Sequence, residues 1–308
     1  MGQIYSKNTR FYLMGIATIF IILLHAHSYA IGSSANLHKI IVYIFKNGAI
    51  GVNLFFLLSA YGLCYSYQNN HIKSYYFKRF KRLMPMLLIY CVFHFILYDD
   101  FIFPISLWHV VSHITGISVF FNDNLLDWFI PTLIFIYIIF PLLFRFCVLL
   151  KKLGLAFTFV LLTVYLLCMI PVYDFDWQLK LPRLCTVIIG ILTYLYEKEG
   201  QLKKIYALYG WAALMSYMSF VEGAYLAVPA IALLISKSED HLPCYKITSF
   251  VGRHSLEIYL AQALCLWKLN YTNYYWFLIT MVVSVVITAF ILWSSQNYFW
   301  KLIDTIKK

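Results

Sequence analysis

The stretch MGIATIFIILLHAHSYA, residues 14–30, decides the class of fold, because most of its side chains are apolar. The apolar run that contains it extends from about residue 11 to 31, and a helix of about 20 apolar residues can cross a bilayer. The stretch also holds two histidines, His25 and His27. An ionisable group inside a membrane helix is costly and is usually kept for chemistry or transport. The stretch therefore predicts a membrane helix that carries a functional site.

The composition of the whole chain agrees with this prediction. Of the 308 residues, 62% are hydrophobic and only 12% are charged, whereas a soluble domain averages about 25% charged residues. The mean hydropathy is +0.76, and the 19% aromatic content suits belts at the two membrane surfaces. The seven cysteines show no metal or redox spacing. We expect one integral membrane domain over residues 1–308.

Apolar segments recur along the entire chain and predict an all-α, polytopic membrane helix bundle. We count about ten candidate spans: 11–31, 47–67, 83–98, 128–148, 154–171, 184–197, 205–221, 223–236, 249–268 and 276–297. An even number of spans places both termini on the same side, and the charge pattern indicates the cytoplasm.

Basic residues gather on the side that this topology assigns to the cytoplasm. They include Lys7 and Arg10 before the first span and the loop HIKSYYFKRFKR, residues 71–82, after the second. The opposite loop, 99–127, has four aspartates and no lysine or arginine, as the positive-inside rule requires. The net charge of +11 is thus explained by cytoplasmic loops, and we expect no nucleic-acid partner.

The outer loop contains an apolar piece, ISLWHVVSHITGISVFF, at residues 105–121. It predicts an interfacial helix or a re-entrant element, with His109 and His113 one turn apart. A histidine pair at this spacing can bind a metal, but no acidic residue has a suitable spacing beside it. We expect no metal site.

Six stretches, taken in order, resemble the integral membrane acyltransferase family 3, whose members are similar to bacterial O-acetyltransferases of cell-surface polysaccharides. Together they cover nearly the whole chain. They are MGIATIFIILLHA, GAIGVNLFFLLSAYGL, YYFKRFKRLMP, WFIPTLIFIYIIFPLL, RLCTVIIGILTY and VGRHSLEIYLAQ.

The resemblance implies a membrane O-acyltransferase of the bacterial plasma membrane. It would move an acetyl or other short acyl group from acyl-CoA, with acetyl-CoA as donor, to a sugar hydroxyl of a cell-surface or lipid-linked polysaccharide. Membrane lipid and polysaccharide-assembly proteins are the expected partners. Two alternatives stay open: a transporter or flippase for a lipid-linked glycan, and a structural partner of a polysaccharide-assembly complex.

The chain departs from the family pattern at several positions. The family places an arginine eleven residues before the histidine, where this chain has Met14. Arg10 lies one helical turn earlier on nearly the same face, so we expect it to reach the same space. Elsewhere the chain has Asn53 where the family is often acidic, Ala60 after Ser59 where it has glycine, and Gln262 where it commonly has histidine.

The resemblance implies that His25 is the general base that deprotonates the acceptor hydroxyl. At a rise of about 1.5 Å per residue, His25 lies roughly 20 Å above the inner start of its helix, in the outer half of the membrane. Asn53, on the next helix, is expected at a similar depth, where its amide would hydrogen-bond the ring and fix its tautomer. The alternative is a neutral structural histidine bonded to a backbone carbonyl.

The candidate donor-binding residues are Arg10, Lys78, Arg79 and Arg82. Arginine matches phosphate with its planar fork, and Lys78 adds to the dense positive charge of the segment. Arg79 and Arg82 share a helix face and match the family's arginine pair. The alternative is ordinary basic charge touching anionic lipid. The pantetheine arm of the donor, roughly 15–20 Å long when extended, would carry the acyl group toward His25.

Two more residues in the predicted spans, Ser59 and Glu257, each have two possible interpretations. The resemblance implies that Ser59 lies beside the reaction channel, and the alternative is a small residue that eases helix contact. Glu257 is expected to face the bundle interior, where it either serves the site or pairs with Arg253 one turn earlier.

Overall fold

The described part of the chain is entirely helical. The computed structural model describes residues 4–29, 47–97, 129–169, 183–218, 226–237, 242–266 and 274–306. These residues form eleven α-helices and one 3-10 helix, with no strand among them. The predicted all-α class is confirmed.

The helices follow the predicted order. They are α1 Lys7–Tyr29, the 3-10 helix η2 Asn47–Ala49, α3 Ile50–Gln68, α4 Ile72–Leu97, α6 Phe129–Leu153, α7 Leu155–Met169, α9 Arg183–Lys198, α10 Leu202–Met218, α11 Val228–Lys237, α12 Tyr245–Arg253, α13 Ser255–Leu266 and α14 Tyr274–Ile306.

Three of the described helices are long and apolar enough to cross a membrane. The candidate spans are Lys7–His25, Ile50–Gln68 and Phe129–Leu153. Shorter apolar helices occupy Leu155–Cys168, Val228–Lys237 and Val282–Tyr298. The count of ten spans and the cytoplasmic position of both ends remain predictions. The His109–His113 pair lies outside the described residues, as does the side chain of His27.

The basic segment expected to be a loop is helical, which corrects the prediction for residues 71–82. α4 begins at Ile72, eleven residues before the predicted start of its span. Leucine, lysine and arginine are good helix formers, and Tyr75 in the first turn is fully buried, so packing holds this basic stretch in the helix. The helix therefore fixes the positions of Arg79 and Arg82 around the axis of α4.

The span predicted at 249–268 is broken. α12 ends at Arg253 and α13 begins at Ser255, with His254 in a non-helical conformation between them (φ −103°, ψ 22°). Arg253 and Glu257 lie on opposite sides of this break, and no ion pair joins these two described residues; the Arg253 guanidinium instead lies 5.6 Å from the centroid of the Phe11 ring. The predicted pairing one helical turn apart is wrong because the helix does not continue.

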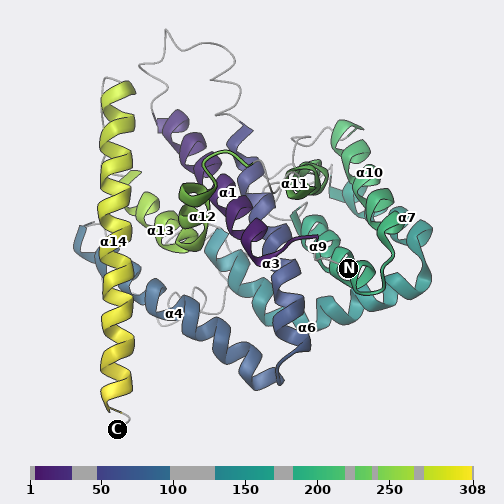
Figure 1. Cartoon of the computed structure of the whole chain (residues 1–308), viewed down its shortest axis with the longest axis horizontal. Helices are drawn as coiled ribbons and strands as arrows, with labels where there is room; N and C mark the ends of the chain where they lie inside the picture. The colour runs from purple at the N-terminus through teal and green to yellow at the C-terminus, as the bar shows by residue number, and fades with distance from the viewer. Residues whose placement is uncertain are drawn as a thin grey trace.

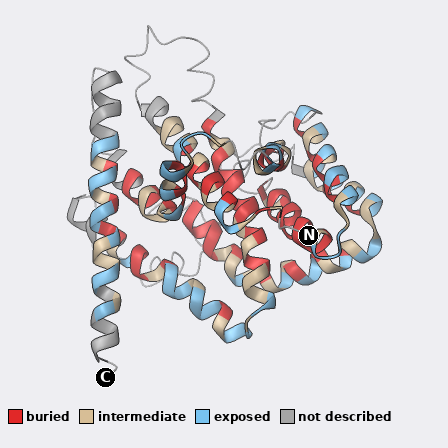
Figure 2. Cartoon of the chain, in the orientation of Figure 1, coloured by how far each residue is buried: buried red, intermediate tan, exposed pale blue. Residues whose placement is uncertain are grey.

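α1, α3 and α9 form the centre of the bundle. α3 packs between α1 and α9, and thirteen of the sixteen residues of α9 are buried. α14 stands along one edge beside α13 and α4, and α7 and α10 pack together on the opposite side (Figure 1). Buried residues concentrate accordingly in the central helices, whereas the middle part of α14, whose burial is described, carries many exposed residues (Figure 2).

Two glycines allow α1 and α12 to pack backbone against backbone. A Cβ atom added at Gly252 would lie 1.8 Å from the carbonyl oxygen of Phe11, and one at Gly15 would lie 1.9 Å from the carbonyl oxygen of Thr248. Both clashes involve backbone atoms, which cannot rotate away. Small residues at a helix interface permit this close approach in membranes.

Gly252→Ala is therefore expected to destabilise the protein, by about 3 kcal/mol of unfolding free energy, the upper range for overpacking. The measurement is the thermal unfolding midpoint of the purified full-length chain. Gly210→Ala is the matched control, because nothing lies within 4 Å of a Cβ there and alanine favours a helix interior. Equal midpoints for the two variants would contradict the close α1–α12 packing.

Candidate functional site

One cavity brings together three of the seven predicted site residues, Ser59, Arg79 and Arg82. It has a volume of about 60 Å³ and lies among α1, α3, α4, α6 and α13. Ser59, Arg79 and Arg82 line it, and Met14 of α1 closes one side. The lining residues come from five helices, so only the folded bundle makes this site.

Arg79 is held in the cavity wall by two tyrosines. The carbon of its guanidinium lies 5.7 Å from the centroid of the Tyr75 ring and 6.0 Å from that of Tyr137, within the range of cation–π attraction. The Tyr75 hydroxyl donates to the Tyr137 carbonyl oxygen at 3.3 Å. Burial raises the pKa of Tyr75 above its ordinary value, against the opposing effect of Arg79, so the phenol stays neutral and does not neutralise the arginine.

The guanidinium of Arg79 keeps hydrogen-bonding capacity for a ligand. Its Nε is buried and has no hydrogen-bond partner in the described part of the chain. The two rings offer π-electrons but no anionic oxygen, and a buried positive charge is stabilised best by an anion. The geometry therefore suits a phosphate or carboxylate at Arg79.

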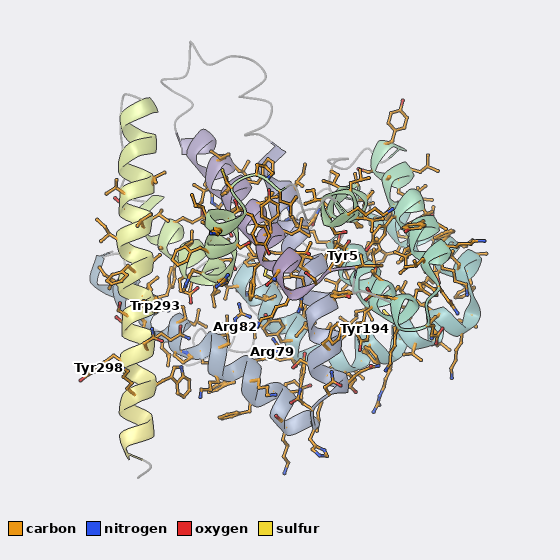
Figure 3. The ribbon with its side chains drawn as sticks, viewed as in Figure 1. Tyr5, Arg79, Arg82, Tyr194, Trp293 and Tyr298 are labelled. Atoms are coloured by element: carbon orange, nitrogen blue, oxygen red, sulfur yellow. The ribbon has the colours of Figure 1, made fainter. Side chains whose placement is uncertain are left out.

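Arg82 and Lys78 differ in position although both neighbour Arg79. Arg82 lines the cavity from an exposed position, one turn after Arg79 on the face of α4 that is turned toward the bundle (Figure 3). Lys78 is exposed and its Nζ donates to Oδ1 of Asn70. It does not line the cavity, because a step of one residue turns a side chain about 100° around the helix. Its assignment as a donor-binding residue stays a prediction.

Aromatic rings form another wall of the cavity. The Phe129 ring of α6 lies 6.0 Å from Phe55 of α3 and 4.8 Å from Tyr259 of α13, between ring centroids. Ser255 and Tyr259 also line the cavity, and both come from the motif VGRHSLEIYLAQ. Of the two tyrosines around Arg79, Tyr75 could have been predicted, because it stands four residues before Arg79 on the same helix. Nothing in the sequence points to Tyr137.

His25 lies on the same face of α1 as the cavity. It is half-buried and stands eleven residues after Met14 on one uninterrupted helix. At 100° and 1.5 Å per residue, the two side chains point within about 20° of each other and lie about 16 Å apart along the axis. His25 does not itself line the cavity of about 60 Å³.

Asn53 does not support the ring of His25, which corrects that expectation. Both polar atoms of its fully buried side chain have no hydrogen-bond partner among the described residues. The glycines show why: a Cβ at Gly51 would lie 2.4 Å from the carbonyl oxygen of Ala17, so this face of α3 meets α1. Asn53 lies about 200° around α3 from Gly51 and is turned away from the histidine helix.

Asn53 instead shares the face of α3 that packs against α9. Leu57, one turn later on that face, has its carbonyl oxygen 2.7 Å from a Cβ placed at Gly190 of α9. One turn before Gly190 stands Thr186, which is also fully buried, with a hydroxyl that has no hydrogen-bond partner among the described residues.

Arg10 does not reach the space beside Met14. Its guanidinium carbon lies 6.0 Å from the centroid of the Tyr61 ring, and its Nη1 lies 2.9 Å from a Cβ placed at Gly62. Arg10 is thus directed toward the C-terminal half of α3 and is not part of the cavity lining. The side chain occupies the space that Gly62 leaves open on α3, so the positive charge beside Met14 comes from Arg79 and Arg82 of α4.

No group of three or more histidine, cysteine, aspartate or glutamate side chains comes together anywhere in the part of the chain that the structure describes. The described residues that line the cavity are two arginines, two serines, aromatic rings and aliphatic side chains.

The described helices form an apolar helical bundle of the kind found in membranes, with a cavity between its helices that Arg79 and Arg82 line. The sequence pattern of the acyltransferase 3 family, described as an acyltransferase domain, matches residues 12–295. The chain belongs to this family and is an acyltransferase of the membrane class. No curated protein and no solved structure is a significant match to the chain.

Proposed function

We propose that the protein is a membrane O-acyltransferase of the bacterial plasma membrane. It transfers an acetyl or other short acyl group from acyl-CoA to a sugar hydroxyl of a cell-surface or lipid-linked polysaccharide. Family membership supports acyl transfer. The observation that carries the rest is the cavity that unites Arg79, Arg82 and Ser59 with Met14 on the histidine helix.

The arginines bind the phosphates of the donor. Arginine presents a rigid fork of donors that matches phosphate oxygens in pairs. Arg79 is pre-oriented by Tyr75 and Tyr137, so little side-chain entropy is lost when a phosphate binds. Arg82 adds a second positive charge at the exposed side of the cavity.

The distance from this cavity to His25 suits the arm of the donor. A pantetheine arm spans roughly 15–20 Å when extended, and Met14 and His25 are separated by about 16 Å on one face of α1. With its phosphates at Arg79 and Arg82, the donor presents its thioester near His25. The acceptor sugar approaches from the opposite side of the membrane.

His25 acts as the general base. Its imidazole takes the proton from the sugar hydroxyl as that oxygen attacks the thioester carbonyl carbon. The new C–O bond forms, the C–S bond breaks, and the departing coenzyme A thiolate receives the proton back from the imidazolium. An ester and free coenzyme A thiol result, with His25 neutral again.

Transfer across the membrane is testable in sealed proteoliposomes. Radiolabelled acetyl-CoA is enclosed with the face of the protein that carries Arg79, and the glycan acceptor is added to the other face. We expect labelled glycan to appear outside while the donor stays inside. Acetylation that occurs only when donor and acceptor share one compartment would refute delivery through the bundle.

A further inference from the structure

A second, larger cavity lies among the helix ends on the other side of α3. It has a volume of about 620 Å³, within the range of about 300–1,000 Å³ typical of ligand sites. Three helices end at this cavity: α3 at Gln68, α9 at Lys198 and α11 at Lys237. α10 begins at it with Leu202. None of its lining residues belongs to the cavity of Arg79.

The acidic group of this cavity is already satisfied by protein donors. The carboxylate of Glu197 accepts hydrogen bonds from the backbone N–H of Ile4 and from the hydroxyl of Tyr61. It therefore ties the start of the chain to α3 and α9 and offers little attraction to a cation.

The two lysines of the cavity keep their positive charge available for a ligand. Lys198 and Lys237 line the cavity against the single glutamate, so its charge is positive on balance. Lys198 Nζ donates to Oε1 of Gln68 at 2.8 Å, a neutral acceptor that orients the ammonium without neutralising it. The ammonium of Lys237 lies 4.8 Å from the centroid of the Tyr206 ring, and cation–π attraction leaves its charge intact as well.

Tyrosines line the cavity, and exposed apolar side chains lie next to it on the surface of the bundle. Tyr65, Tyr194 and Tyr206 line it, and tyrosine is enriched at the depth of lipid headgroups. Tyr206 is 43% exposed, and next to the cavity on α11 Ile231 and Leu234 are 44% and 66% exposed. Apolar exposure of this kind suits acyl chains and distinguishes the cavity from a site open only to water.

We propose that this cavity binds the phosphate of an anionic phospholipid headgroup, with Lys198 and Lys237 as the charge partners. Basic pockets between membrane helices on the cytoplasmic side bind such headgroups. The headgroup lies between the two ammonium groups, and the acyl chains run along the exposed side chains of α10 and α11. The bound lipid bridges the ends of α3, α9, α10 and α11.

The test is binding of dioctanoyl phosphatidylglycerol to the full-length chain in a neutral detergent, followed by native mass spectrometry. We expect Lys198→Gln/Lys237→Gln to bind this lipid roughly thirtyfold more weakly than the unmodified protein, given the contribution of each basic residue near a leaflet. The matched control is Lys152→Gln/Lys203→Gln, which removes two exposed lysines outside the cavity; its affinity should stay unchanged.

Two further measurements distinguish an anionic lipid from other possible ligands of the cavity. Dioctanoyl phosphatidylcholine should bind all variants weakly, and neither inorganic phosphate nor acetyl-CoA should displace phosphatidylglycerol. Displacement by either soluble phosphate would overturn the proposal in favour of a water-soluble ligand, as would unchanged lipid binding by the double variant. If loss of the Gln68 contact destabilises the double variant, Lys237→Gln alone carries the test, with an expected loss of roughly fivefold.

Discussion

His25→Ala is expected to lower the rate of acyl transfer by about 10²–10⁴-fold, the usual contribution of a positioned general base. Without the imidazole, nothing at that place takes the proton from the sugar hydroxyl, so the oxygen attacks the thioester as a weak neutral nucleophile. Donor binding should remain, because Arg79 and Arg82 of α4 line the cavity beside Met14, and Met14 lies about 16 Å from His25 along α1. The measurement is transfer of labelled acetyl groups by the purified enzyme, with the KM for acetyl-CoA determined in parallel.

His71→Ala is the matched control for this experiment. His71 is exposed in the turn before α4 and should leave the rate unchanged. In cells, the His25 variant should make surface polysaccharide of normal chain length that lacks acyl groups. Loss of polymer export with acylation intact would instead favour the transporter interpretation.

Arg79→Ala is expected to raise the KM for acetyl-CoA by about 10–100-fold, because a hydrogen bond to a charged group contributes about 1.5–3 kcal/mol. The turnover at saturating donor should change much less, since Arg79 does not touch the reacting atoms in this scheme. Arg79→Lys should recover only part of the affinity, because the ammonium keeps the charge but loses the planar fork that lies over the rings of Tyr75 and Tyr137.

Lys73→Ala serves as the control, because it removes an exposed positive charge from the first turn of the same helix. If charge at the membrane surface were all that mattered, Lys73→Ala and Arg79→Ala would raise the KM equally. That result would remove the donor-binding role of the cavity and leave Arg79 as ordinary surface charge.

The sequence predicted the helices well because hydrophobic length is a local property. The starts of α1, α3, α6, α7 and α9 lie within a few residues of the predicted spans. The shared face of Arg79 and Arg82 was also predictable, since the helical repeat alone places residues three apart side by side. The extent of α4 was not, because basic residues are common in loops and in helices, and the burial of Tyr75 decided between them.

The errors concern residues whose partners lie on another helix. Asn53 and His25 were expected at one depth, but similar depth does not say which way a side chain turns. Arg10 was expected beside Met14, yet the space left by Gly62 directs it to Tyr61. In both cases the rotation of α1 relative to α3 determines which way the side chain points. That rotation depends on close contacts made by many residues along both helices.

The sequence by itself determined that this chain is a helical membrane protein of the acyltransferase 3 family, with a histidine in its first helix and an arginine pair in a basic segment. Composition, the length of apolar runs and short motifs suffice for that, because each acts within one segment. Only the tertiary structure decided that Arg79 lies between two tyrosines, that Met14 and Ser59 share its cavity, and that Asn53 faces α9. These neighbours are set by how helices rotate and approach one another, and backbone contacts at glycines such as Gly15, Gly51 and Gly252 control that approach.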